Sequence, residues 1–143
     1  MVCIEQGMAI DYEYLNSFCQ HVIDIDGSIR WAGIVNKNGV IIAQQKRRGL
    51  QLLLTDEENE EYASSAIARQ KTRGKFEIKI GKMHYAFGRY EKLHRATIPI
   101  NQTAYLLLTI DVEQKNFDAL IMQEVLPLIE KQRTRFVAMN DSI

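Results

Sequence analysis

The segment Ile29–Gln45, IRWAGIVNKNGVIIAQQ, is the feature that most constrains the fold. Two apolar stretches flank the turn Asn36-Lys37-Asn38-Gly39, and asparagine and glycine readily adopt the positive φ that a tight hairpin turn requires. Both faces of each stretch are largely apolar near the turn, which is typical of covered strands. The pattern predicts a β-hairpin in the middle of an antiparallel sheet. Gly33 also predicts a bulge, or a close approach by another backbone.

Helices are predicted on both sides of this hairpin. Apolar residues spaced three and four apart over Ile10–Ile25 predict an amphipathic helix, which ends where Gly27 suits a left-handed cap. Thr55 and Glu58 have capping-box spacing, so we expect a second helix from there to about Thr72. Helix initiation also explains the acidic residues after Thr55, because negative charge is favoured at a helix N-terminus.

Residues 73–81 fit two structures. Apolar and charged residues alternate in this stretch, which favours a strand, followed by a hairpin turn at Gly81-Lys82 and another strand over residues 83–87. The alternative continues the second helix to Ile80, with Gly81 as its cap. We favour the strand.

The remaining elements complete the predicted order. Strands are expected near Leu93–Ile100 and Tyr105–Asp111, and a final helix over Glu113–Arg135, kinked at Pro127. The order is then helix, strand, strand, helix, two or three strands, helix. It predicts an α+β fold, with an antiparallel sheet of four to five strands flanked by three helices.

The chain has the length of one domain, and we expect residues 1–143 to form it, with a core over residues 10–135 and flexible ends at 1–8 and 137–143. No apolar run approaches the roughly 20 residues that span a membrane. The first residues do not resemble a signal peptide. We therefore expect a cytoplasmic protein with no membrane insertion, in which Cys3 and Cys19 are reduced thiols.

The sequence offers no pattern of residues that indicates an enzyme. His21, His84 and His94 lack metal-ligand spacing, although His84 and His94 could approach each other across neighbouring strands. Cys19 and His21 would lie on different helix faces, which argues against a Cys/His nucleophile. We expect no catalytic residue, no metal site and no cofactor.

Two segments carry a family resemblance. Ala32-Gly33-Ile34-Val35, followed by Asn38-Gly39-Val40-Ile41-Ile42-Ala43, resembles the hairpin of the roadblock-type dynein light-chain family and its profilin-like relatives. The strand TAYLLLTID and the helix after it are similar too, so the resemblance covers about Asp11 to Lys131. It implies a small non-enzymatic module that forms homodimers and serves small GTPases or multiprotein complexes. The long basic stretch before the later strands departs from the family pattern.

A shorter resemblance involves Tyr90-Glu91-Lys92-Leu93 and Arg95-Ala96-Thr97-Ile98-Pro99. These residues look like a recurring segment of small uncharacterised archaeal domains. This likeness implies no function.

Basic residues are concentrated in one part of the chain, although the net charge is zero, which argues against a dedicated nucleic-acid binder. Of the 18 Lys and Arg residues, 12 lie between Lys46 and Arg95. On a shared face they would attract an acidic protein, a phosphate-bearing ligand or nucleic acid. Otherwise they form a solvated surface balanced by nearby acids. The candidate surface consists of Lys46, Arg47, Arg48, Arg69, Arg73, Lys75, Lys79, Arg89, Lys92 and Arg95.

Three functions follow from these patterns. The leading prediction is a homodimeric interaction module that binds a protein partner, with a small GTPase as one class. The first alternative is a PAS-like sensor with a small molecule in a closed pocket lined by residues such as Trp31, Tyr85 and Phe87. The second alternative is binding of nucleic acid or another polyanion through the basic residues.

Overall fold

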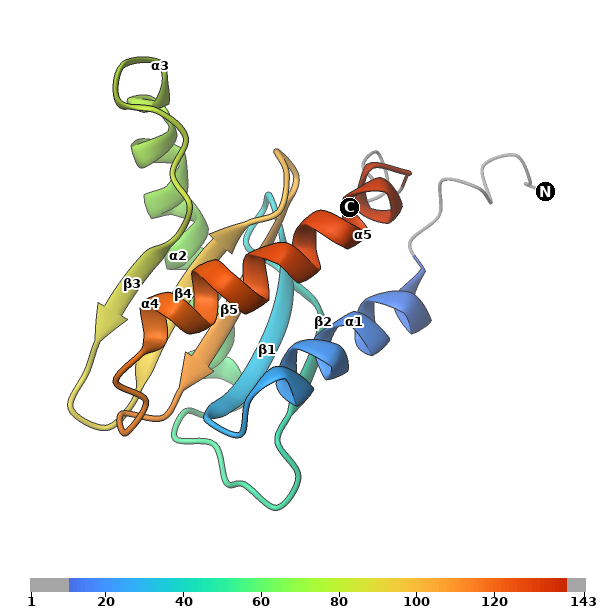
Figure 1. Ribbon diagram of the computed structural model, residues 1–143, viewed down its shortest axis with the longest axis vertical. Helices are drawn as coiled ribbons and strands as arrows, with labels where there is room; N and C mark the ends of the chain where they lie inside the picture. The colour runs from blue at the N-terminus through green and yellow to red at the C-terminus, as the bar shows by residue number, and fades with distance from the viewer. Residues whose placement is uncertain (1–10, 139–143) are drawn as a thin grey trace.

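A single antiparallel sheet with helices on both faces forms the fold of residues 11–138, the part of the chain that the computed structural model describes (Figure 1). The strands are ordered β2-β1-β5-β4-β3. The predicted fold class and order of elements are confirmed. The elements are α1 (Tyr12–Ile25), β1 (Ile29–Asn36), β2 (Ile41–Lys46), α2 (Asp56–Gly74), α3 (Glu77–Ile80), β3 (Ala86–Arg89), β4 (His94–Pro99), β5 (Ala104–Ile110), α4 (Phe117–Leu120), the π-helical turn η2 (Ile121–Val125) and α5 (Leu126–Ala138).

The ends for which flexibility is expected fall largely outside this description. Segments 1–8 and 139–143 lie beyond the described residues, whereas residues 137 and 138 belong to α5.

The hairpin of β1 and β2 forms as predicted, but only β1 is central. The turn depends on Gly39, which has φ 82°, and on Asn36, whose Oδ1 accepts from the backbone N–H groups of Asn38 and Val40. A Cβ on Gly39 would lie 2.8 Å from the Cα of Ser64, so the turn packs closely on α2. β1 pairs with β2 and β5, whereas β2 is an edge strand, which corrects the expected position of the hairpin in the sheet.

Gly33 accommodates a side chain rather than another backbone. The indole ring of Trp31 lies across it, and a Cβ at Gly33 would be 2.4 Å from the ring. The irregularity in the pairing of β1 with β2 occurs one residue later, between Ile34 and Val35. Glycine at this position therefore makes room for the tryptophan.

The end of α1 is capped by a distant arginine, and not by Gly27. Asp26 at the C-cap is extended, with φ −153°, and Gly27 is not in the left-handed region. Instead Arg47 donates from Nη2 to the backbone oxygens of Ile23 and Asp26, at 2.6 and 2.7 Å. Its Nε donates to the oxygen of Ile29 at 2.9 Å. Because Arg47 follows β2, these bonds tie α1 to the edge of the sheet.

The strand predicted for residues 73–81 is wrong, as are the hairpin turn at Gly81-Lys82 and the early start of the next strand. α2 continues to Gly74, α3 follows at Glu77–Ile80, Gly81 caps it with φ 92°, and β3 begins only at Ala86. Ile78 is 96% exposed, so the alternating apolar residues face no sheet. α3 and the end of α2 project beyond the sheet (Figure 1).

The C-terminal helix is continuous but widens before Pro127. It begins at Phe117, later than expected, and η2 includes a bond from the N–H of Leu126 to the oxygen of Ile121. A proline removes one backbone donor and crowds the preceding turn. A π-turn is one way to relieve that crowding within a helix.

The two faces of the sheet carry separate cores. α1 and the α4–α5 helix cover one face with a large cluster that includes Phe18, Ile121 and Phe136. α2 covers the other face with a smaller cluster, in which Ala63, Ala66 and Ile67 meet sheet residues. Within the described residues, no helix is both long and apolar enough to cross a membrane.

Candidate functional site

The outer face of α2 is the first candidate surface. The helix buries Asn59, Ala63, Ala66, Ile67 and Gln70 against the sheet, and its opposite side is exposed. The small residues Ser65 and Ala68 lie on that exposed side near the middle of the helix. Small side chains let two helices approach closely. We call the exposed side of α2 the α2 outer face.

Charge is divided along α2. Its first half carries acids and its second half carries bases, so the helix begins negative and ends positive. Each sign opposes the charge of the helix dipole at its own end, which stabilises the helix. The division also makes α2 complementary to an antiparallel copy of itself. The exposed charged residues are Asp56, Glu57, Glu58, Glu60, Glu61, Arg69, Lys71 and Arg73.

Two further features adjoin this helix. β3 is a short edge strand that pairs with β4 alone, so its outer side is free to pair among the described residues. The tip formed by α3 exposes apolar side chains, with Phe76 at 56%, Ile78 at 96% and Ile80 at 83%. An exposed apolar group of this kind indicates an interaction surface.

The predicted basic surface is spread over separate parts of the molecule. Lys46 ends β2 at one edge of the sheet, and Arg47 and Arg48 follow it. Arg89 and Lys92 lie near the β3–β4 turn at the other edge. Arg69 and Arg73 lie on α2, and Lys75 and Lys79 lie at its projecting end. The structure therefore does not bring the ten residues onto one continuous face.

Two members of that surface face into the protein. Arg47 is half-buried and bonded to three carbonyl groups at the end of α1. Arg95 on β4 is only 4% exposed. The others are exposed, and some have local partners: Lys46 donates to the oxygen of Leu50, and Arg73 donates to Gln70.

Arg95 lies at the bottom of a pocket beside α2. The guanidinium is 3.7 Å from the centroid of the Tyr62 ring and 5.8 Å from that of Trp31. Its Nη2 donates to Oδ1 of Asn59 at 3.1 Å, while Nε is buried without a hydrogen-bond partner. No ion pair joins Arg95 to a carboxylate of the described residues.

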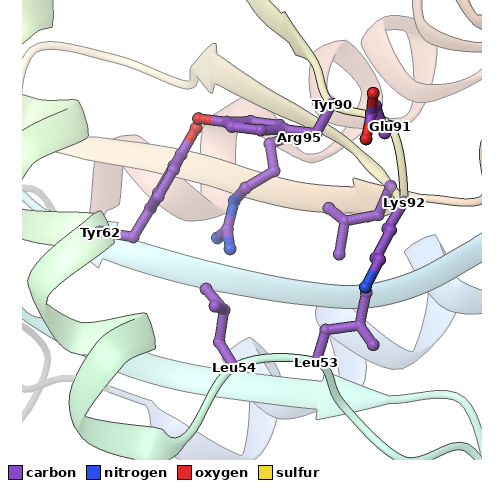
Figure 2. A pocket seen from close by; sticks show the side chains of 8 residues that line it. Leu53, Leu54, Tyr62, Tyr90, Glu91, Lys92 and Arg95 are labelled. Atoms are coloured by element: carbon purple, nitrogen blue, oxygen red, sulfur yellow. The ribbon is translucent and has the colours of Figure 1, made fainter.

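The pocket, here called the Arg95 pocket, has a volume of about 470 Å³. Figure 2 shows the guanidinium pointing into the space between Tyr62 and Leu54, with Tyr90 above it. Its walls come from the loop before α2, the first turns of α2, and the β3–β4 turn. The lining residues are Leu53, Leu54, Tyr62, Tyr90, Glu91, Lys92, Leu93 and Arg95.

The electrostatics of this site follow from burial. Burial lowers the pKa of the Arg95 guanidinium, although arginine remains protonated. Burial, and a hydrogen bond with Tyr90, raise the pKa of the Tyr62 hydroxyl, and the positive charge of Arg95 opposes this. The Tyr62 ring is therefore neutral, and Arg95 is the one buried charge among the lining residues.

Outside the Arg95 pocket, the histidine and cysteine side chains of the described residues do not form a cluster. His94 is buried against the rings of Phe87 and Phe117, whereas His84 adjoins Pro99 at the opposite end of β4. The approach of the two histidines that neighbouring strands would have allowed therefore does not occur. Burial raises the pKa of the Cys19 thiol to about 12. In the part of the chain described, no three His, Cys, Asp or Glu residues could hold a metal ion.

The closed pocket expected for a PAS-like sensor does not form around its predicted residues. Trp31 belongs to the core under α2, whereas Phe87 stacks on Phe117 at 4.0 Å on the other face of the sheet. Tyr85 lies on the same face as Phe87, where it donates a hydrogen bond to Asp118. Side chains separated by the sheet cannot line one cavity.

Sequence reasoning did not identify the surroundings of Arg95. The residues around it come from a segment 33 to 42 positions earlier, and no local pattern links that segment to β4. They are Leu53, Leu54, Asn59 and Tyr62. One signal was present: Arg95 lies within a run of residues that a sheet would cover, which is unusual for a charged residue.

Comparisons with known proteins agree with this architecture. The family described as "Family of unknown function (DUF6659)" matches residues 8–138. No curated protein matches the sequence significantly. A structure of MglB with tetrameric arrangement has a TM-score of 0.73 and 11% identity, covering 95% of this chain and 97% of that one. The Roadblock/LC7 domain from Streptomyces avermitilis has a TM-score of 0.67 and 11% identity, with coverages of 86% and 98%.

A profilin of Schizosaccharomyces pombe is more distant, with a TM-score of 0.52 and 14% identity, covering 86% of this chain and 96% of the profilin. At these identities the solved structures show the fold alone, and they confirm the predicted roadblock and profilin-like architecture. The chain belongs to the DUF6659 family and has the fold of roadblock/LC7 domains.

Proposed function

We propose that the protein is a non-enzymatic, homodimeric interaction module. In the proposed dimer the two α2 helices pack antiparallel through their outer faces, and the free edges of the two β3 strands lie side by side. The observation that carries the proposal is the α2 outer face, which has small residues at its middle and opposite charges at its ends.

The charge pattern supports an antiparallel pair centred near Ser65. A two-fold axis at that position would place Glu61 opposite Arg69 of the partner, and Glu57 opposite Arg73. Parallel packing would instead bring like charges together. Pairs of this kind each add little when exposed, but they select orientation strongly.

The same arrangement accounts for the exposed apolar tip. Antiparallel packing would carry Phe76 and Ile78 of one copy past the start of the other copy's α2, where Leu53 is 53% exposed. Apolar surface on both sides would then be removed from water, which is the main favourable term in protein association. The tip projects beyond the sheet, as such a contact requires (Figure 1).

A second protein is the proposed partner of this dimer, and a small GTPase is the class that the resemblance to roadblock-like modules favours. A solved protein of this fold is described with a tetrameric arrangement, which supports self-association as a property to test. A cytoplasmic location is part of the same proposal.

Light scattering coupled to size exclusion tests the dimer. We expect a dimer at tens of micromolar, and a monomer for Ala68→Arg, because a long charged side chain at the middle of α2 keeps the helices apart. Ser17→Arg, at an exposed position of α1, is the matched control and should remain dimeric. A monomeric unaltered protein at this concentration would refute the proposal.

A charge exchange tests the orientation. Glu61→Arg and Arg69→Glu should each weaken the dimer, since each places like charges opposite each other. The double variant restores opposite charges and should recover most of the affinity. Additive losses in the double variant would exclude the antiparallel arrangement.

A further inference from the structure

The Arg95 pocket contains a positive charge for which the protein supplies no negative partner. Arg95 is 4% exposed, its Nη2 donates to a neutral amide, and its Nε has no acceptor. Buried charges in proteins are normally paired, because removing them from water is costly. Aromatic faces attract a cation, but they do not neutralise it. The missing element is an anion.

The side chains that line the pocket indicate the chemical character of the rest of the ligand. Leu53, Leu54 and Leu93 supply aliphatic surface, and the rings of Tyr62 and Tyr90 supply aromatic surface. The volume of about 470 Å³ falls within the range of about 300–1,000 Å³ typical of small-molecule sites. A ligand here would bury an apolar body against these side chains.

The charges at the site favour a single negative charge. Arg95 is the buried cation, while Lys92 and Glu91 lie at the rim and carry opposite signs. A doubly charged phosphate would meet one guanidinium and also the carboxylate of Glu91. A carboxylate is planar and singly charged, and it matches the donor geometry of arginine.

We propose that the Arg95 pocket binds a small carboxylic acid with an apolar aliphatic or aromatic body, whose carboxylate pairs with the guanidinium of Arg95. The apolar body would lie between the leucines and the two tyrosine rings. The residues of this site are assembled within one chain, although Leu53 would also meet the partner's apolar tip in the proposed dimer.

The protein contains a natural reporter for this site. Trp31 is its one tryptophan, and its ring is 5.8 Å from the Arg95 guanidinium. Fluorescence titrations would use 4-methylpentanoate and 3-phenylpropanoate as probes. Their neutral amides, 4-methylpentanamide and 3-phenylpropanamide, are the matched controls, and inorganic phosphate tests for nonspecific anion binding. Thermal unfolding with the same probes gives a second readout.

We expect saturable binding of at least one carboxylate below roughly 10 mM, and at least about tenfold weaker binding of its amide. Arg95→Met should weaken carboxylate binding by about tenfold or more. Arg48→Met is the control, since Arg48 is an exposed arginine that does not line the pocket. Its affinity should be unchanged.

A second variant keeps the test decisive if Arg95→Met fails to fold. Leu53→Phe enlarges a half-exposed wall residue, leaves Arg95 in place and should reduce the affinity for the carboxylates. The absence of a saturable response to both carboxylates would overturn the proposal. So would equal binding of acid and amide, binding of phosphate as tightly as of the carboxylates, or unchanged affinity in folded Arg95→Met.

Discussion

The face of the sheet under α1 and α5 carries a large cluster of apolar side chains, whereas the face under α2 carries a smaller cluster to which the helix contributes mainly small residues. On the first face Phe18 and Phe136 meet edge to face, with ring centroids 5.0 Å apart. On the second, α2 contributes two alanines, one isoleucine and two buried amides. Burial of apolar area is the main source of folding stability, so the face under α1 and α5 contributes more of that stability.

The face under α2, which is the more lightly packed one, carries surface features that do not contribute to core stability. Three of these features lie on or beside α2: its outer face, the projecting tip and the Arg95 pocket. Arg95 is a buried charge that a core optimised for stability would replace by an apolar residue. The difference between the faces fits the proposal that one holds the fold while the other meets a partner or a ligand.

The largest expected effect is on the heavily packed face. Phe18→Ala should lower the free energy of unfolding by about 3–5 kcal/mol, because it leaves a cavity beside Phe136. Urea denaturation followed by circular dichroism measures the change. Tyr12→Ala is the control: Tyr12 is 53% exposed at the start of α1, so this aromatic-to-alanine substitution should cost less than about 0.5 kcal/mol. Equal losses would contradict the assignment of the core.

A matched pair of isoleucines compares the two faces directly. Ile129→Ala on α5 should cost about 3–4 kcal/mol, since large side chains surround it and cannot collapse. Ile67→Ala on α2 should cost about 2 kcal/mol, because the cluster around it is smaller and includes partly buried side chains that can relax into the space. Urea denaturation of both variants gives the difference. A larger loss for Ile67→Ala would reverse the comparison.

Arg47 tests how the heavily packed face is attached to the edge strand. Arg47→Met keeps most of the aliphatic stem but removes the donors to the oxygens of Ile23, Asp26 and Ile29. We expect a loss of about 1–3 kcal/mol in the free energy of unfolding, since partly buried carbonyl groups lose their partners. Arg48→Met, one residue later and exposed, should be nearly neutral. Similar small losses for both would exclude the capping role.

The elements that sequence reasoning identified are those whose signals are local. The turn at Gly39 and the capping box of Thr55 and Glu58 depend on residues within a few positions of one another, and both form as expected. The strand pattern at residues 73–81 failed because alternation indicates a strand only when one side meets a sheet. There Ile78 meets solvent instead.

The roles of the basic residues could not be predicted in this way. Arg47 caps a helix that ends some twenty residues earlier, and Arg95 lies under an aromatic ring from α2. Only the folded chain brings these partners together. A count of charges along the sequence therefore grouped the half-buried Arg47 and the buried Arg95 with exposed basic residues, although their surroundings differ.

The smallest expected effect concerns His94, at the margin of the heavily packed face. Its Nδ1 is buried without a partner, and burial, with Arg89 and Lys115 nearby, lowers its pKa. In the unfolded chain the histidine takes up a proton near pH 6.5, whereas in the folded chain its pKa is lower, so it takes up the proton only at a lower pH. The unfolded state then binds more protons, so stability should fall as the pH drops through about 6.5 toward the lower folded pKa.

Urea denaturation at about pH 7.5, 6.5 and 5.5 measures this dependence, with carboxylates contributing equally to each variant. His94→Leu should flatten the curve between pH 7.5 and 5.5, because it removes the group that the folded state keeps neutral. His84→Leu, at an exposed position, should leave the slope unchanged. Parallel curves for the unaltered protein and His94→Leu would show that His94 is protonated as readily in the folded chain. That result would mean that water reaches His94 at the edge of the face under α1 and α5. The two faces would then differ in packing only among residues nearer the centre of the sheet.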